Sequence, residues 1–419
     1  MPPSADALQA PPLGPFAPMA PAGQLMNTAP PDSTATVRRG YAIAAGLALG
    51  VAVSNGLGRF SYGLILPAMR ADLGWNYTQA GALNTANAIG YLIGALLALN
   101  IVRKLGPSRL FVGALWITAA AIAAMAFTAD FHTMIGLRLL AGISGAVVFI
   151  SGSVLAASLF PRDPTRAAGA IATYFAGGGV GLLLPGVALP LLFAVGGDAA
   201  WPGAWLGMGL FSGVLSLVIA AAARQVTAPP PHAAPHPWPK RQLLATFASY
   251  GCYALGYFAY MTFIVAWMRE QGASNTEVAI MWIVLGVATI ISPRGWAGPI
   301  ARWRGGRPLA GMLLAIGIGA LLPLLGASPL VMLTSAVLFG QFFMPPAAVT
   351  ALVKKAFSPV VWGEAVAAFT LLFSALQLIG PVLTGAVADQ TGSLAWGLGI
   401  SGAILIIGAG ISLLQPEPK

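Results

Sequence analysis

The sequence predicts an all-α integral membrane protein, and three observations lead to this class. Of the 419 residues, 58% are hydrophobic and 8% are charged, whereas about a quarter of the residues of soluble domains are charged. The mean hydropathy is +0.82. The apolar stretches run for about 20 to 27 residues, are rich in Gly and Ala, and lack the polar and apolar alternation of outer-membrane strands. We therefore expect spanning helices.

Stretches that fit spanning helices occur in two sets of six, separated by Gly, Pro or charged residues. The first set lies near residues 41–66, 78–101, 109–129, 133–159, 168–194 and 203–223. The second set lies near residues 243–268, 276–300, 308–327, 329–353, 364–388 and 394–414. The sequence thus predicts twelve transmembrane helices in two six-helix bundles.

The segments between the spans predict the domain organisation. Residues 1–39 are rich in Pro and Ala and lack the basic and apolar regions of a cleaved signal, so we expect a disordered tail. The stretch RQVTAPPPHAAPHPWPKRQ, residues 224–242, predicts a polar linker. It separates an N-terminal bundle at 40–223 from a C-terminal bundle at 243–414, which a short tail at 415–419 follows.

The charges in the loops indicate the orientation in the bilayer. Sixteen Lys and Arg residues fall on one side of the predicted spans, and two, Arg70 and Arg269, fall on the other. Cationic loops are retained on the cytoplasmic side. We therefore expect a multi-pass protein of the bacterial inner (plasma) membrane, surrounded by lipid, with both termini and the linker in the cytoplasm.

The sequence also argues against several classes of function. The formal net charge of +10 is explained by orientation, so we expect no nucleic-acid partner. Cys252 is the single cysteine, and His232 and His236 of the linker have no third ligand nearby, so we expect no metal and no cofactor. The sequence contains no P-loop, HExxH or Ser-His-Asp set, which argues against an enzyme and against an ATP-driven pump. Gradient-driven transport remains.

The stretch GLGRFSYGLILPAMRADLGWNYTQAGALNTANAIGYLIGALLA, residues 56–98, resembles the opening signature of the YbfB/YjiJ-like branch of the major facilitator superfamily of secondary transporters. GQFFMPPA, residues 340–347, is similar less closely, and the resemblance covers residues 40–414. It implies the major facilitator fold, with two bundles that rock around a central site, and a small-molecule solute as partner. Gly-rich faces are needed inside such bundles, so they do not argue for a dimer, and we expect a monomer.

Two motifs of the superfamily are matched in part. RLLAGISGA, beginning at Arg138, is similar to the fourth-helix motif that places an arginine and then glycines at the cavity. VRKLGPSRL, residues 102–110, is similar to the motif that latches the cytoplasmic side, although Arg103 stands where that motif has its aspartate, and ARWRGGRPL, 301–309, echoes it in the second half. The gate residues that we expect, from these loops and the cytoplasmic end of the eighth span, are Arg103, Arg109, Arg294 and Arg302.

Asn55, Arg59 and Tyr62 are spaced i, i+4, i+7, which predicts one face of the first helix. Arg59 lies about five residues past the middle of the predicted span, or roughly 8 Å toward the outside. Its side chain could snorkel to the outer headgroups. However, Cα–Cβ bonds tilt toward the helix N-terminus, which is cytoplasmic here, so we favour an arginine that faces the cavity and contacts substrate or a gate.

Other polar residues inside the spans are candidates for the same cavity, each with a packing alternative. Arg138 could face the cavity or cap neighbouring carbonyls. Asn84, Asn87 and Gln377 could contact solute or join helices. Tyr253 and Tyr257, inside a one-faced stripe with Tyr250 and Tyr260, could donate hydroxyl groups to the cavity or pack as ordinary aromatic residues. The predicted substrate-binding set is Asn55, Arg59, Tyr62, Asn84, Asn87, Arg138, Tyr253, Tyr257 and Gln377.

The placement of the acidic residues favours one kind of solute. Every Asp and Glu lies in a tail, a loop or near a span end, which disfavours an exporter of cationic drugs, since such exporters usually need a carboxylate inside the membrane. Two cations without a carboxylate attract an anion. The leading hypothesis is a secondary active transporter of a small anionic or polar organic solute, with protons as a candidate coupling ion. The alternatives are a multidrug or metabolite exporter and a non-transporting membrane sensor.

Overall fold

The computed structural model describes residues 34–161, 163–227, 238–358 and 361–417. Contacts divide the chain into Met1–Arg39 and Gly40–Lys419, and the second unit contains the helices whose packing defines the fold. The predicted tail up to residue 33, most of the predicted linker with His232 and His236, and the last two residues lie outside the described ranges.

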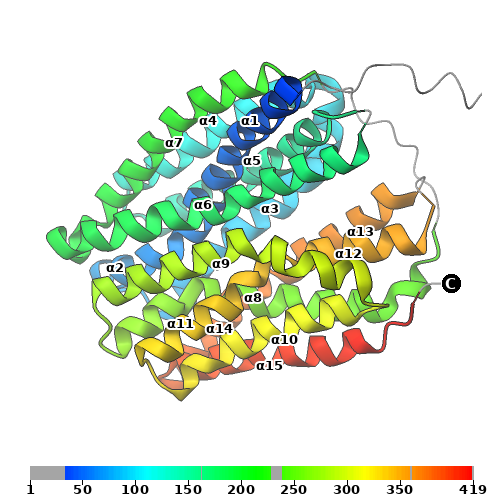
Figure 1. Ribbon diagram of the computed structural model, residues 1–419. Helices are drawn as coiled ribbons and strands as arrows, with labels where there is room; N and C mark the ends of the chain where they lie inside the picture. Colours follow the sequence, from blue (N-terminus) through cyan, green and yellow to red (C-terminus); the bar gives the residue numbers. More distant parts are fainter. Residues whose placement is uncertain (1–33, 162, 228–237, 359–360, 418–419) are drawn as a thin grey trace, which may run out of the picture. The chain divides into compact units, whose positions relative to one another are not determined.

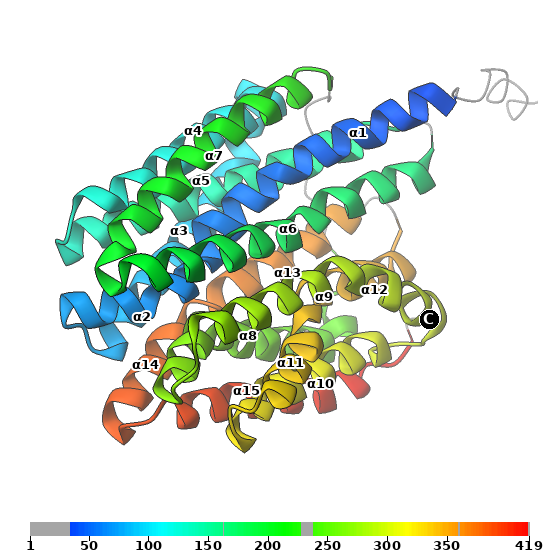
Figure 2. The same ribbon diagram turned by 60° about the vertical axis from the view of Figure 1, so that its left-hand side comes forward.

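Twelve spans in the described part of the chain are long and apolar enough to cross a membrane, and they form two six-helix bundles (Figure 1, Figure 2). The N-terminal bundle contains α1 (Thr34–Val51), η1 (Ala52–Phe60), α2 (Tyr62–Leu73), α3 (Tyr77–Leu105), α4 (Pro107–Ala124), η2 (Met125–Phe127), α5 (Phe131–Ala157), α6 (Pro164–Gly196), η3 (Asp198–Ala200) and α7 (Trp201–Ala223). The C-terminal bundle contains η4 (Lys240–Leu243), α8 (Leu244–Glu270), α9 (Asn275–Arg302), α10 (Arg307–Leu321), η5 (Leu322–Leu325), α11 (Pro329–Phe339), η6 (Gly340–Phe343), α12 (Pro345–Ala356), α13 (Trp362–Leu376), α14 (Ile379–Thr391) and α15 (Leu394–Leu413). The predicted fold class is confirmed.

The first span is longer than the sequence predicts. α1 begins at Thr34, inside the predicted tail; its own residues include no proline, and cationic side chains are tolerated at a span end. At the other end, α2 continues to Leu73 and stops at Gly74, whose φ of 67° is the left-handed conformation that ends helices. A span predicted from hydropathy is too short when polar or charged residues lie at the ends of the helix.

The two ends of the bundles are named here by their turns. The distal end carries residues 74–76, 271–274 and 392–393, and the proximal end carries residues 303–306 and 414–417. At the distal end, α3 and α9 begin with the same device, a capping box, formed by Asn76 with Gln79 and by Ser274 with Glu277. These two helices occupy corresponding places in the two halves, which supports an internal repeat.

The bundles meet where α3 packs against α14, α6 against α9, and α2 against α8. Glycine permits the α3–α14 contact. A Cβ atom on Gly81 would lie 2.4 Å from the Pro381 carbonyl oxygen, and one on Gly385 would lie 2.3 Å from the Tyr77 carbonyl oxygen. Small residues let the backbones of membrane helices approach closely, so the distal half of this interface is tightly closed.

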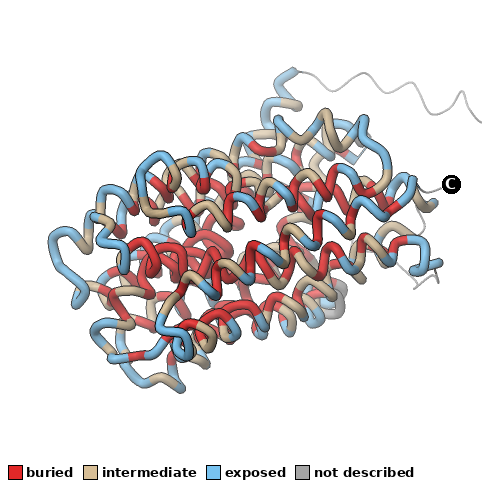
Figure 3. Tube along the Cα trace, turned by 90° about the horizontal axis from the view of Figure 1, so that it is seen from below, coloured by how far each residue is buried: buried red, intermediate tan, exposed pale blue. Residues whose placement is uncertain are grey.

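The buried residues lie between the helices (Figure 3), and many large apolar side chains are exposed on the outside of the spans. Leu210 and Leu217 of α7 are each 61% exposed, and Trp396 of α15 is 64% exposed. Large apolar side chains in such numbers on the outside fit hydrocarbon rather than water as the surrounding solvent.

The first span contains a π-helical segment, η1, between α1 and α2. Its wide turn is closed by a hydrogen bond from the Ser61 N–H to the Gly56 carbonyl, at 3.0 Å. Gly56 lies directly against the backbone of Gly181 of α6. Such wide turns occur frequently at functional sites.

Prolines interrupt two further spans, which the sequence predicts as continuous. The Phe342 carbonyl would pair with residue 346, but Pro346 has no N–H, and the Tyr253 hydroxyl donates to this carbonyl instead, at 2.5 Å. Likewise Gln377 would pair with Pro381, and α13 ends at Leu376 while α14 begins at Ile379. Thr85 of α3 donates to the Leu378 carbonyl inside this break, at 2.9 Å.

Candidate functional site

Arg59 lies in η1 between the two bundles and is 3% exposed. Its side chain reaches the level of the helix midpoints. It contacts Tyr91, the fifteenth of the 29 residues of α3, and Phe258, the residue after the midpoint of α8. The side chain therefore does not snorkel to a headgroup region, in agreement with the inward tilt expected from Cα–Cβ geometry.

One amide joins Arg59 to the C-terminal bundle. Arg59 Nη2 donates a hydrogen bond to Gln377 Oε1, which also accepts from the Tyr257 hydroxyl at 3.1 Å. Gln377 is buried and lies at the break between α13 and α14. Three spans, the first, the seventh and the eleventh, are thus linked through one carbonyl oxygen. The three predicted site residues Arg59, Tyr257 and Gln377 are brought together.

Aromatic rings surround the Arg59 guanidinium. Its Cζ atom lies 4.5 Å from the centroid of Phe258, 4.9 Å from that of Tyr91 and 5.7 Å from that of Phe60. Phe258 belongs to the C-terminal bundle and the other two rings to the N-terminal bundle. Ring faces attract a cation, which lowers the cost of burying this charge without neutralising it.

Two hydrogen-bond donors at this point have no acceptor. Arg59 Nε and Gln377 Nε2 are both buried, and neither has a hydrogen-bond partner. A buried donor without an acceptor carries the full cost of its desolvation. The pair therefore marks a place where an acceptor group can bind with a gain in free energy.

None of the described Asp and Glu residues is buried beside the unpaired donors of Arg59 and Gln377. Arg59 and Arg138 are buried, whereas none of the described Asp and Glu residues is. Buried charges in proteins are ordinarily paired. The expectation that acidic residues avoid the middle of the membrane agrees with this distribution, and the electrostatic demand at Arg59 is for an anion.

Arg138 differs from Arg59 because the protein satisfies it. Its Nη1 donates to the Gly58 carbonyl at 2.7 Å, its Nη2 to Asn84 Oδ1 at 2.9 Å and its Nε to the Leu83 carbonyl at 3.4 Å. Its Cζ atom lies 4.8 Å from the Tyr62 ring centroid. Arg138 therefore ties α5 to the π-helical segment and to α3.

The remaining predicted residues have protein partners of their own. Asn84 Nδ2 donates to Thr262 of α8 at 2.7 Å, and Asn87 Nδ2 donates to the Arg138 carbonyl at 3.2 Å. Tyr253 donates to η6, as described above. These contacts join helices, which is the packing alternative for asparagine and tyrosine inside membranes.

Asn55, Arg59 and Tyr62, which the sequence predicts on one face, have different hydrogen-bond partners. Asn55 donates to Ser54 at 3.3 Å, and the Tyr62 hydroxyl donates to the Ala80 carbonyl at 2.7 Å, whereas Arg59 donates to Gln377. The i, i+4, i+7 rule holds for an α-helix, and the π-helical segment η1 shifts the following residues around the axis.

The predicted gate residues lie at the proximal end or near it. Arg109, Arg294 and Arg302 are exposed. Arg103 lies in α3, and its side chain is outside the described part of the chain. The described geometry gives these arginines no role in the site around Arg59.

A latch at the distal end joins the bundles through charged groups that the sequence analysis left out. The Asp389 carboxylate of α14 accepts from the N–H groups of Tyr77 and Thr78, each at 2.8 Å, and from the Thr78 hydroxyl at 2.5 Å. It thus caps the N-terminus of α3, a helix of the other bundle, where unpaired N–H groups and the helix dipole favour an anion.

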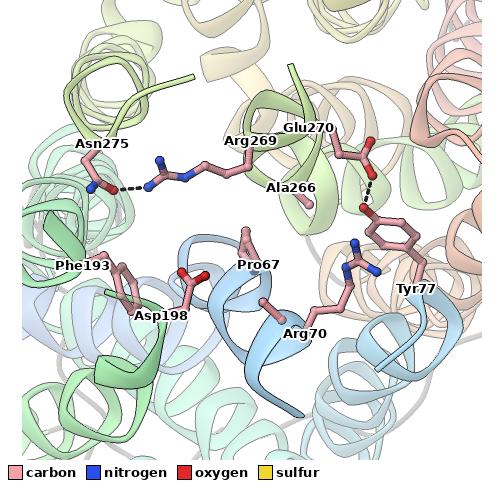
Figure 4. A pocket seen from close by; sticks show the side chains of 10 residues that line it. Pro67, Arg70, Tyr77, Phe193, Asp198, Ala266, Arg269, Glu270 and Asn275 are labelled. Atoms are coloured by element: carbon pink, nitrogen blue, oxygen red, sulfur yellow. Dashed lines mark hydrogen bonds between the residues drawn. The ribbon is translucent and has the colours of Figure 1, made fainter. Parts of the chain in front are cut away.

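A pocket of about 380 Å³ lies beside this latch (Figure 4). Tyr77 donates to Glu270, and Arg269 donates to Asn275, on opposite sides of the pocket. Arg70 lies with its Cζ atom 4.0 Å from the Tyr77 ring centroid. Arg70 and Arg269, the two cations that depart from the charge bias of the loops, therefore both line this pocket.

Asp389→Ala is expected to open the distal end. We expect the rate at which a maleimide labels a cysteine at position 266, in the wall of the pocket, to rise about tenfold, because hydrogen bonds to a charged group contribute about 1.5–3 kcal/mol. The measurement uses detergent-purified protein with the changes Cys252→Ser and Ala266→Cys; Ala266 is 3% exposed. Asp130→Ala is the matched control, because Asp130 caps its own helix α5. Equal labelling in the two variants would refute the latch.

The predicted set omits Tyr91, although its spacing places it on the helix face of Asn84 and Asn87, and it also omits Phe258 and Asp389. The Phe258 ring carries no signal in a sequence full of apolar residues. Asp389 carries a weak signal, since it is an acidic residue at the end of a span. Its partner Tyr77, however, is 312 residues away along the sequence.

A twelve-span protein whose two six-helix bundles enclose a buried cation and interrupted helices has the architecture of the major facilitator transporters. Two solved structures share the fold. A bacterial homologue of the human lysosomal transporter Spinster has a TM-score of 0.67 at 15% identity, covering 90% of this chain and 97% of that one. The nucleoside transporter NupG has a TM-score of 0.64 at 13% identity, covering 91% and 98%.

The family model described as "Uncharacterised MFS-type transporter YbfB" matches residues 51–413, and the chain belongs to this family. An "Uncharacterized MFS-type transporter" of Yersinia pestis (strain Pestoides F) is 26% identical over 273 residues, which are 64% of this chain and 65% of the relative. The chain thus spans 65% of the length of this Yersinia relative. A "Chloramphenicol resistance protein" of Streptomyces lividans is 29% identical over 160 residues, 38% of each chain.

Proposed function

We propose that this protein is a secondary active transporter that moves a small organic anion across the bacterial inner membrane by alternating access. The observation that carries the proposal is the buried Arg59 with its unpaired Nε, beside the unpaired Nε2 of Gln377. Inside a membrane, a charge without a partner is a functional site by default. Solute sites of such transporters lie near the midplane and are formed by discontinuous helices, and η1 and the break at Gln377 meet here.

The roles proposed for the other residues follow from their contacts. Arg59 and Gln377 bind the solute, and Tyr257 orients the Gln377 amide. Arg138 and Asn84 position the π-helical segment rather than contact the solute. The exposed arginines of the proximal end, Arg109, Arg294 and Arg302, together with Arg103, act as gate or orientation residues.

The proposed cycle is a rocking of the two bundles, 40–223 against 243–414, around the Arg59 site. The distal end is the periplasmic one, because the cationic loops lie at the proximal end, and the latch of Asp389 closes it. A carboxylate solute can carry its own proton, so symport with protons needs no acidic residue of the protein. The proposed functional unit is a monomer, since both walls of the site come from one chain.

A second candidate function is export of a neutral or cationic drug. The similarity to the chloramphenicol resistance protein favours it, and so do the rings around Arg59. A neutral or cationic drug, however, would not pair with the Arg59 guanidinium, and Arg59 Nε and Gln377 Nε2 would still lack an acceptor.

Thermal unfolding of the detergent-purified protein separates the two functions. We expect at least one carboxylate of a panel of acetate, succinate and benzoate to raise the melting temperature by about 3 °C at saturating concentration, because ligands of the folded state stabilise it by mass action. Their amides, tetraphenylphosphonium and chloramphenicol are expected to have no effect. Stabilisation by chloramphenicol or tetraphenylphosphonium, with none by any carboxylate, would replace the anion transporter by the exporter. Uptake into proteoliposomes under imposed gradients then identifies the coupling ion.

A further inference from the structure

A set of five near-parallel rings, called the ring stack, lies beside the Arg59 and Gln377 donors. Tyr257 is its centre. The rings of Tyr253, Phe258, Phe342 and Phe373 lie 5.0 to 6.0 Å from the Tyr257 ring, at interplanar angles of 16° to 26°. Because the Tyr257 hydroxyl donates to Gln377 Oε1, the ring stack begins at the polar atoms of the site.

The polar part of the site has capacity for one carboxylate. Gln377 Oε1 already accepts two hydrogen bonds, so the surplus at this point consists of donors, Arg59 Nε and Gln377 Nε2. A carboxylate has acceptor oxygens and no donor, and its bonds to a guanidinium are charge-assisted. The other buried arginine, Arg138, is engaged by protein acceptors on three of its atoms. A second carboxylate on the same solute would find no further buried cation among the described residues.

The apolar part of the site is aromatic on both sides of the interface. Besides the ring stack of the C-terminal bundle, Tyr91 and Phe60 of the N-terminal bundle face the guanidinium, and Phe60 meets the Phe342 ring edge-on at 5.5 Å. Aromatic pairs are favoured in offset-stacked or edge-to-face arrangements. A flat ring can join such a set by stacking, whereas a puckered ring of the same size cannot.

Two rings of the ring stack lie on interrupted spans, whereas the other three lie on the continuous helix α8. Phe342 lies in η6, ahead of Pro345 and Pro346, and Phe373 lies four residues before Gln377, in the last turn of α13. Helix ends at breaks can absorb changes in φ and ψ that a continuous helix cannot. These rings can therefore part to admit a solute when the bundles move.

We propose that the solute is an aromatic monocarboxylate, whose carboxylate binds Arg59 and Gln377 and whose ring enters the ring stack. This inference rests on the proposed function, because it assigns the body of the anion that the proposed transporter carries. It excludes dicarboxylates and small aliphatic acids as preferred solutes.

Four compounds test the inference by isothermal titration calorimetry on the detergent-purified protein. Benzoate is the reference, cyclohexanecarboxylate keeps the charge without the flat ring, benzamide keeps the ring without the charge, and terephthalate adds a second carboxylate. We expect cyclohexanecarboxylate to bind about 2- to 10-fold more weakly than benzoate, the worth of one aromatic contact. We expect terephthalate to bind at least about 100-fold more weakly than benzoate, because its second charge is buried unpaired. We expect benzamide to bind more weakly by a similar factor, because it brings no charge to the guanidinium.

The variant Phe373→Leu adds a second readout. Leucine keeps apolar volume and removes one ring of the stack, so the preference for benzoate over cyclohexanecarboxylate is expected to shrink toward onefold while both still bind. If benzoate, cyclohexanecarboxylate and terephthalate bind equally and Arg59→Gln weakens all three, the aromatic inference is wrong and the anion transporter stands. If benzamide binds as tightly as benzoate, or no carboxylate binds, the proposed function fails and the inference fails with it.

Discussion

Arg59→Gln is expected to weaken benzoate binding by at least about 100-fold and to leave the protein folded. The loss follows from removing charge-assisted hydrogen bonds, each of which contributes about 1.5–3 kcal/mol. The fold survives because Arg59 is a cation without a carboxylate in the described structure, so its burial opposes folding. We therefore expect the melting temperature of the ligand-free variant to equal or exceed that of the wild type. Calorimetry gives the affinity, and thermal unfolding gives the stability.

Two substitutions serve as controls for Arg59→Gln. Arg59→Lys keeps the charge and loses the planar fork, so it should bind benzoate with an intermediate affinity. Arg224→Gln removes an exposed arginine at the end of α7 and should bind as the wild type does. An Arg59→Gln protein that unfolds on purification would show that Arg59 holds the bundles together. A folded variant that binds benzoate normally would show that Arg59 is not the solute site.

Arg138→Met is expected to show the opposite pattern, with loss of stability as its first effect. The substitution leaves the Gly58 carbonyl and Asn84 Oδ1 buried without their donor. Each such group costs about 1–3 kcal/mol, so we expect the free energy of unfolding to fall by about 3 kcal/mol and the melting temperature by roughly 5 to 10 °C. Thermal unfolding in detergent, with and without benzoate, is the measurement.

Arg294→Met is the matched control for Arg138→Met, because it makes the same change at an exposed arginine of α9. Its melting temperature should stay within about 1 °C of the wild type, as for most surface substitutions. An Arg138→Met protein that melts like the wild type and has lost benzoate binding would move Arg138 from the scaffold into the solute site.

The fold could be predicted from the sequence because hydropathy, loop charge and span length constrain a membrane protein strongly. The interruptions inside the spans were harder to predict from the sequence. Pro345, Pro346 and Pro381 are visible in the sequence, but membrane helices tolerate proline, and only the packing decides whether one ends a helix. The π-helical segment η1 has no sequence signature of its own, and it changes the helical register between Arg59 and Tyr62.

Individual residues of the candidate site could be predicted from the sequence, but the contacts between them could not. A lone arginine inside a span, such as Arg59, stands out by charge alone, and Gln377 stands out by polarity. Their pairing across 318 residues depends on tertiary geometry that one sequence does not encode locally. The same holds for the difference between Arg59, whose Nε has no acceptor, and Arg138, whose three nitrogens each have one. The rings that complete the site, such as Phe258 and Phe373, are indistinguishable from core residues before folding.

The most direct test of the anion site is a thermodynamic cycle between the protein and its ligand. Benzoate and benzamide are titrated into the wild type and into Arg59→Gln, so that the guanidinium and the carboxylate are removed singly and together. If the two groups bind each other, removing both costs no more than removing either one, because the second removal breaks nothing further. If the two losses multiply instead, the carboxylate and Arg59 act independently, and Arg59 is not the anion site.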